Sequence, residues 1–153
     1  MLSLFGPKAR DILQVVTLND VSDNGHPFGS ARQISIAGCP VLALRITYVG
    51  ELGWELHFPV EYAQTIYNTL IEAGLPLGLR NAGYRAIETL RLEKGYRAWS
   101  SDIGPDHTPD EAGLGWAIKM KSNISFKGRE AIAKQRAEGI KTVSYTHLRA
   151  HET

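Results

Sequence analysis

The chain has 153 residues and carries 17 basic and 16 acidic side chains, which gives a formal net charge of +1. Its length suffices for one domain with a sizeable core, and no basic cluster or interleaved aromatic stripe indicates nucleic-acid binding. No apolar run approaches the ~18 residues that a membrane span requires, and residues 1–5 are too short for the apolar region of a signal peptide. The lone cysteine, Cys39, excludes an internal disulfide framework and a multi-cysteine metal site. It fits a reducing compartment, either the bacterial cytoplasm or, in a eukaryote, the mitochondrial matrix.

The start of the chain is predicted to form a helix and then a loop. Pro7 suits the first turn of a helix, and the apolar residues after it recur at helical spacing: Ala9, Ile12, Leu13 and Val16. Residues 19–30 are rich in Asp, Asn, Gly, Pro and Ser, a composition typical of a surface loop. We therefore expect His26, within this loop, to be solvated.

Three strands follow without a helix between them, which favours an antiparallel sheet. The first spans residues 32–37, and the next two form a hairpin around the glycine-containing stretch 48–55. In the first hairpin strand Leu42, Leu44, Ile46 and Tyr48 share a face by period two. In the second, Trp54, Leu56 and Phe58 share one face, and Glu55 and His57 point the other way. The hairpin is either an ordinary core element with a solvated Glu55 or part of a binding site.

Two helices come next. An apolar stripe between Pro59 and Gly74 predicts the first, with Gly74 at its C′ position: Ala63, Ile66, Tyr67, Leu70 and Ile71. The second is expected to begin with Asn81 as its N-cap and to end at Gly95. Arg85 lies in it, where an ion pair with Glu88 three residues on would be the ordinary structural role for this arginine.

The remainder reads as a loop over residues 96–109, a short strand over 113–119 with Trp116 on its apolar side, and a charged helix over 127–138. Four side chains here superficially resemble a metal cluster: Asp102, Asp106, His107 and Asp110. They lack a ligand spacing, and turn formation and helix capping are far commoner roles for Asp. The whole pattern predicts an α+β fold, with one antiparallel sheet and helices packed on one side. The sequence shows no phosphate-binding glycine loop, nucleophile elbow or zinc motif.

Four ordered motifs carry a family resemblance. Residues 48–55 read Tyr-Val-Gly-Glu-Leu-Gly-Trp-Glu, and residues 84–95 read Tyr-Arg-Ala-Ile-Glu-Thr-Leu-Arg-Leu-Glu-Lys-Gly. They are followed by Thr-Pro-Asp-Glu-Ala-Gly-Leu at 108–114 and Lys-Gly-Arg-Glu-Ala at 127–131. Over roughly residues 4–140 the chain resembles the folate-binding domain of the glycine-cleavage aminomethyltransferase (T-protein) family. It is most similar to the C-terminal half of the sarcosine and dimethylglycine dehydrogenases.

The resemblance implies a tetrahydrofolate site formed by Tyr48, Glu55 and Arg85. In the family the tyrosine and the second glutamate of the hairpin motif contact the pterin, and the arginine adds a ligand contact or orients the glutamate. Gly50 and Gly53 would permit the φ angles of the loop and a close approach of ligand to backbone. Glu51 is expected to be structural, and no catalytic residue or metal ligand is expected in this stretch.

The same resemblance implies an interior piece of a longer enzyme. Residues 1–125 correspond to part of the folate-binding domain, and residues 126–142 to a helical connection towards a C-terminal β-barrel. The FAD domain and the family's catalytic aspartate would lie upstream, so we expect no activity from these 153 residues alone. Its expected partners are folate and those other domains of the same chain, with no nucleic acid and no membrane. Residues 143–153 match nothing in the family and read like a translated sequencing adapter, so they are excluded from fold reasoning.

Two other functions remain open from the sequence. One is a stand-alone aminomethyltransferase, and the other is a non-catalytic folate-binding or regulatory module on the same fold. An upstream flavin-binding Gly-x-Gly-x-x-Gly unit and the missing aspartate would favour the dehydrogenase.

Overall fold

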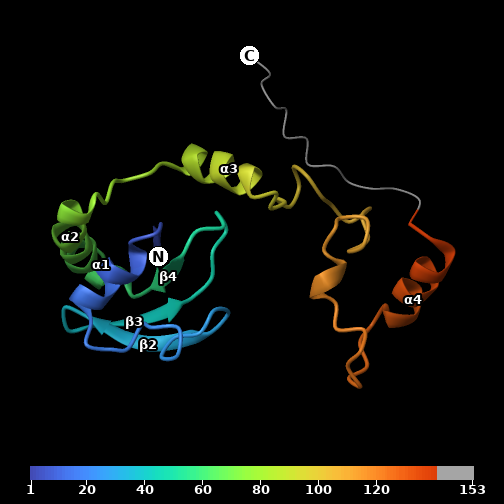
Figure 1. Cartoon of the computed structure of the whole chain (residues 1–153), viewed down its shortest axis with the longest axis horizontal. Helices are drawn as coiled ribbons and strands as arrows, with labels where there is room; N and C mark the ends of the chain where they lie inside the picture. The colour runs from blue at the N-terminus through green and yellow to red at the C-terminus, as the bar shows by residue number, and fades with distance from the viewer. Residues whose placement is uncertain (141–153) are drawn as a thin grey trace, which may run out of the picture. The chain divides into compact units, whose positions relative to one another are not determined.

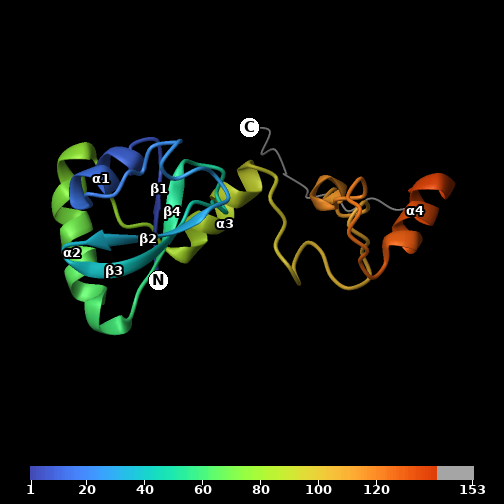
Figure 2. The same cartoon turned by 90° about the horizontal axis from the view of Figure 1, so that it is seen from below.

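The computed structural model describes residues 1–140, and the expected adapter-like tail lies outside the described residues. The chain divides into two compact units, Met1–Lys94 and a second that begins at Gly95, and each is described by itself (Figures 1 and 2). The secondary structure of the first unit comprises these elements: β1 (Leu2–Phe5), α1 (Ala9–Val16), β2 (Ala31–Ile36), β3 (Cys39–Leu44), β4 (Gly53–His57), α2 (Ala63–Gly74) and α3 (Tyr84–Glu93). Short 3₁₀ turns at Val60–Tyr62 and Leu75–Leu77 flank α2.

The sheet of the first unit has four strands in the order β1-β4-β3-β2, and every neighbouring pair is antiparallel. The predicted α+β fold, with an antiparallel sheet and helices on one side, is confirmed. The sequence reading did not identify β1. This strand supplies only four residues, yet its pairing with β4 makes β4 an inner strand of the sheet.

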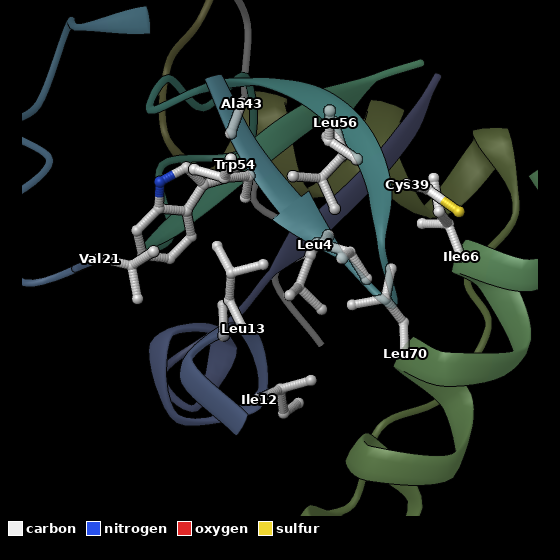
Figure 3. Packing of buried hydrophobic residues seen from close by; sticks show 14 residues of the cluster. Leu4, Ile12, Leu13, Val21, Cys39, Ala43, Trp54, Leu56, Ile66 and Leu70 are labelled. Carbon is white, nitrogen blue, oxygen red and sulfur yellow. The ribbon is translucent and has the colours of Figure 1, made fainter. Parts of the chain in front are cut away.

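The core lies between the sheet and helices α1 and α2. Figure 3 shows Leu13 of α1 and Leu70 of α2 directed towards the strand residues Trp54 and Leu56. Both of these strand residues have no solvent-exposed surface, which confirms the predicted burial of their face. On β3 the buried residues include Val41 and Ala43, so the face that Leu42 and Leu44 share is the one these helices leave uncovered.

Two helix boundaries differ from the prediction. Helix α3 begins after Gly83, so Asn81 is not its N-cap; the Asn81 side-chain amide instead donates to the Tyr67 hydroxyl at 2.7 Å. Gly74 is the last residue of α2 rather than its C′ residue, because the chain continues into a 3₁₀ turn. The left-handed position falls on Gly78, with φ of +86°.

The expectation of a solvated His26 is wrong, because this residue is fully buried. Its imidazole lies edge-on to the Trp54 ring, with centroids 6.1 Å apart. Arg45 donates to the His26 backbone carbonyl at 2.8 Å, and its guanidinium lies 5.6 Å from the Trp54 ring centroid. Asp23 accepts from Arg10 at 2.7 Å and lies 2.6 Å from Arg45. The polar loop is therefore tied to the core by the buried Arg45, which pairs at its outer end with the exposed Asp23.

This packing changes the acid–base properties of the loop. Burial lowers the pKa of the His26 imidazole, because the charged form is disfavoured away from water. The hydrogen bonds from Arg10 and Arg45 lower the pKa of Asp23 to about 2.

The second unit contains a 3₁₀ helix, Gly115–Ala117, and helix α4, Arg129–Glu138. The predicted strand over residues 113–119 is wrong, and Trp116 is 83% exposed rather than packed on an apolar side. Asp110 forms a two-bond pair with Arg136 of α4, both contacts at 2.8 Å, which lowers the pKa of Asp110. No helix within residues 1–140 has the length and apolar character needed to cross a membrane.

Candidate functional site

Glu55 projects from the middle of β4, on the sheet face opposite the core. The neighbouring residues Trp54 and Leu56 point into the core, so strand alternation directs the Glu55 side chain to the uncovered face. In register it lies between Leu44 of β3 and Ser3 of β1. Its side chain is 23% exposed, so the carboxylate is largely but not completely shielded from solvent.

His57 shares this face with Glu55, as the alternation predicted. Its Nε2 atom lies 3.5 Å from Glu55 Oε2, an ion-pair distance that applies when the imidazole is protonated. The His57 ring is 41% exposed, but Nε2 itself is closed off from solvent. Within residues 1–140 this nitrogen makes no hydrogen bond, so its 3.5 Å approach to Glu55 is a close contact rather than a bond. The resemblance did not single out this histidine, although its spacing from Glu55 was visible in the sequence.

Tyr48 lies in the connection between β3 and β4, because β3 ends at Leu44. The predicted extension of that strand to Tyr48 is wrong; the tyrosine lies in the loop that joins the two hairpin strands and is 37% exposed. Val49 beside it is buried and anchors the connection.

The two motif glycines have different roles in the structure. Gly50 has φ of +77°, the left-handed conformation expected for the loop. Gly53 has no positive φ, and its close neighbour is protein rather than ligand: a Cβ there would lie 2.2 Å from the Leu4 carbonyl oxygen of β1.

Arg85 is exposed near the start of α3. Within residues 1–140 it forms no ion pair with Glu55, and the expected Glu88 partner instead pairs with Arg91. Arg91 is almost fully buried, which the sequence reading missed; the Glu88–Arg91 spacing of three residues was the available signal. A ligand role for Arg85 stays a prediction.

A mostly apolar cavity of about 350 Å³ opens beside the hairpin in the same unit. Its walls come from β1, α2, α3 and the residues between the two helices. Ser3 and Val49 line it, and these residues are direct neighbours of Glu55 and Tyr48 in the sheet register and along the chain. None of the three predicted site residues, Tyr48, Glu55 and Arg85, lines this cavity; Ser3 and Val49 are its lining residues nearest to them in register and along the chain.

The Asp-rich segment of the second unit shows turn and pairing roles. Asp102 accepts from the Ala98 amide at 2.9 Å, and His107 Nδ1 accepts from the Gly104 amide at 3.2 Å. Across the part of the chain that the structure describes, no three His, Cys, Asp or Glu residues are grouped closely enough to hold a metal ion.

Two known dehydrogenases are similar in sequence to this chain. The chain is 49% identical over 141 residues to mitochondrial sarcosine dehydrogenase of Mus musculus, covering 92% of this chain and 15% of that protein. It is 40% identical to mitochondrial dimethylglycine dehydrogenase of Rattus norvegicus over the same length, covering 16% of that protein. The chain thus spans less than a fifth of either dehydrogenase.

A solved structure agrees with these sequence matches. The glycine cleavage system aminomethyltransferase T from Bartonella henselae superposes with a TM-score of 0.69 at 27% identity, over 88% of this chain and 35% of that one. Residues 1–122 match the model of the GCVT N-terminal domain. The chain therefore belongs to the GCVT N-terminal domain family.

Proposed function

We propose that this chain is the tetrahydrofolate-binding module of an FAD-dependent N-methyl amine dehydrogenase that acts on sarcosine or dimethylglycine. The observation that carries the proposal is the placement of Glu55. It is a half-buried carboxylate on the uncovered face of an inner strand. Membership of the family and the 49% identity to a sarcosine dehydrogenase support this choice of enzyme.

The donor and acceptor chemistry of the site suits a pterin. One edge of the pterin ring presents two neighbouring N–H donors, and an ionised carboxylate accepts both with its two oxygens. Glu55 would be that acceptor. Tyr48 would contribute its ring face for packing and its hydroxyl for one polar contact, and Arg85 would add a ligand contact from α3.

In the proposed enzyme the residues of this chain bind and orient folate rather than break bonds. Amine oxidation would take place at the flavin, in a part of the protein outside these 153 residues. Tetrahydrofolate supplies the nitrogen atoms that take up the one-carbon unit released by that oxidation. The contribution of Glu55 is therefore to hold the pterin in one orientation and away from bulk water.

A stand-alone aminomethyltransferase is the second candidate, because the Bartonella henselae structure with the same fold carries that name. Both candidates use a folate site, so the hairpin does not distinguish between them. The full-length gene distinguishes them: a dinucleotide-binding strand–helix unit upstream supports the dehydrogenase, and a chain without such a unit supports the transferase.

The site is tested by Glu55→Gln in the full-length protein, with Glu51→Gln as the matched control from the same motif. The amide places a donor opposite one pterin N–H and leaves that contact unmade. An unpaired buried polar group costs about 1–3 kcal/mol, so folate affinity should fall roughly 5- to 150-fold. Calorimetry with 5-formyltetrahydrofolate measures this affinity.

The product distribution supplies the functional readout. In the Glu55→Gln variant, dye reduction by sarcosine should persist, while more of the released carbon appears as formaldehyde than as methylene-tetrahydrofolate. Glu51 is exposed in the connection, and its variant should bind folate as the unmodified protein does. Equal affinity and equal product ratio in all three proteins would show that Glu55 is not the pterin acceptor.

A further inference from the structure

We infer that an extended segment of the full-length protein, from outside these 153 residues, pairs with the open edge of β1 and seats its apolar side chains in the cavity beside it. The inference rests on the part of the proposed function that makes this chain one module of a longer enzyme. Its starting point is the position of β1 at the end of the strand order β1-β4-β3-β2.

The backbone pattern of β1 shows which of its polar groups face that edge. Hydrogen-bonded and non-hydrogen-bonded residue pairs alternate along an antiparallel ladder. Gly6, the residue after β1, donates its amide to the Leu52 carbonyl at 2.8 Å in the register of the β1–β4 pair, so Leu4 also belongs to the hydrogen-bonded set. The amides and carbonyls of Ser3 and Phe5 therefore point away from β4. In the part of the chain that the structure describes, no strand pairs with β1 on that side.

The mostly apolar cavity runs along this same edge. Every residue of β1 (Leu2–Phe5) lines it, although successive side chains of a strand point to opposite faces. A space that all of them border lies beside the strand rather than above or below the sheet. The opposite wall comes from α2 and α3 and includes Leu70, Ile71 and Leu90. An element inserted here would lie between β1 and the two helices.

The size of the cavity suits one added strand. Protein interiors contain few voids larger than a water molecule, whereas this apolar space measures about 350 Å³. A strand rises about 3.3 Å per residue, so a segment of about four residues would run along the whole of β1. Leu4 and Leu70 belong to one core cluster (Figure 3). Apolar side chains of the added strand that point to this face would extend that cluster.

The two edges of the sheet differ in how they are protected. Sheet edges that stay free in soluble proteins are commonly blocked by charged side chains, proline or a covering loop. On β2, Arg32 supplies a charge, and the Asn19 side chain accepts from the Ser35 amide at 3.0 Å. Strand β1 reads Leu-Ser-Leu-Phe and has neither a charged residue nor a proline. The β2 edge is therefore protected against further pairing, and the β1 edge is suited to it.

The length of the relatives favours another part of the same polypeptide as the occupant. This chain spans 15% of the sarcosine dehydrogenase of Mus musculus, so a full-length protein of that kind has most of its residues elsewhere. A tethered segment reaches its site at an effective concentration on the order of mM, which favours it over a second copy of the chain. Its sequence should carry apolar residues at alternate positions and no proline.

Amide hydrogen exchange of the full-length protein, measured residue by residue with mass spectrometry, tests the added strand. Gln33 of β2 is the matched control, because its amide points outwards like that of Ser35 two residues later. The amides of Ser3 and Phe5 should be protected at least about 10-fold more than the Gln33 amide, since they would donate to the added strand. Protection at Ser3 and Phe5 no greater than at Gln33 overturns the inference.

A photo-crosslink identifies the occupant. Photo-leucine is placed at Leu90, a cavity-lining residue that is 38% exposed, and in a control protein at Leu75, which is 53% exposed and does not line the cavity. The expected product joins Leu90 to a peptide of the same polypeptide outside these 153 residues, and Leu75 should not reach that peptide. A cross-link from Leu90 to a second copy, distinguished by denaturing electrophoresis, assigns the edge to a dimer and overturns the inference. Protected β1 amides with no cross-link to a peptide outside these residues, or with the same cross-link from Leu75, overturn the cavity as the seat of the strand.

Folate binding by Glu55→Gln, measured alongside, keeps the two proposals apart, because Glu55 does not line the cavity. Fast exchange at the β1 edge together with weaker folate binding by Glu55→Gln retains the folate site and refutes the added strand. Slow exchange at that edge together with unchanged folate binding by Glu55→Gln retains the added strand and refutes the site.

Discussion

Trp54 is the side chain on which the core of the first unit depends most, and Trp54→Ala tests that packing. The ring is completely buried, and its contacts include the Arg45 guanidinium and the edge of His26. Replacing a buried Trp by Ala costs about 3–5 kcal/mol, and loss of a desolvated cation–π contact adds up to about 2 kcal/mol. The indole N–H has no hydrogen-bond partner within residues 1–140, so its removal breaks no hydrogen bond there. We expect a loss of at least about 3 kcal/mol.

Urea unfolding of the 153-residue chain, followed by circular dichroism, measures this change. Trp116→Ala is the matched control: the same substitution on a side chain that is 83% exposed, expected within about 0.5 kcal/mol of the unmodified chain. Trp54 belongs to the unit Met1–Lys94, and for a unit of that length each kcal/mol shifts the melting temperature by about 4–8 °C, so Trp54→Ala should lower it by more than about 10 °C. A loss below about 1 kcal/mol would refute the packing described for β4.

Three further predictions concern the loop and the strand pairing. The lowered pKa of Asp23, about 2 in the folded chain, means that its ion pairs stabilise the fold above about pH 4 and are lost as pH falls towards 2; Asp23→Asn should flatten the melting temperature over that range. Burial lowers the pKa of His26, so stability should rise with pH through about 6.5, and His26→Gln should remove that rise when melting is measured from about pH 5 to 8. Gly53→Ala should destabilise the sheet, because the new Cβ would meet the Leu4 carbonyl oxygen at 2.2 Å; faster amide exchange in β1 would reveal it.

The sequence correctly predicted the elements in which apolar residues recur with a clear helical or strand period. Alternation around Trp54 correctly separated the buried face of β4 from the face of Glu55, because each neighbour along a strand reverses direction. The apolar stripe of α2 likewise predicted the burial of Ile66 and Leu70. In these elements the local sequence pattern and the tertiary packing favour the same conformation.

The incorrect predictions concern residues whose neighbours in space come from distant parts of the chain. Strand β1 has only four residues and exists through pairing with β4, which no local pattern records. His26 lies in a segment of loop composition, and it is buried because Trp54 and Arg45 lie against it. Trp116 shows the converse, since this apolar side chain is 83% exposed among the described residues.

The proposed binding residues of the hairpin rest on resemblance rather than on physical reasoning alone. A glutamate at alternating position in a strand is most often simply solvated, and spacing does not distinguish Glu55 from that case. The structure adds partial burial of Glu55 and a histidine, His57, 3.5 Å from its carboxylate. Arg85 has no comparable support, because within residues 1–140 it forms no ion pair with Glu55.

The two faces of β4 allow stability and binding to be tested independently. Trp54 and Glu55 are adjacent in the chain but point to opposite sides of the sheet, so substitution of one does not remove contacts of the other. Glu55→Gln should therefore leave the urea midpoint of the 153-residue chain within about 0.5 kcal/mol of its unmodified value, while weakening folate binding in the full-length protein. A large loss of stability in Glu55→Gln would mean that the carboxylate is retained for folding. In that case reduced folate affinity in the same variant would no longer identify a ligand contact.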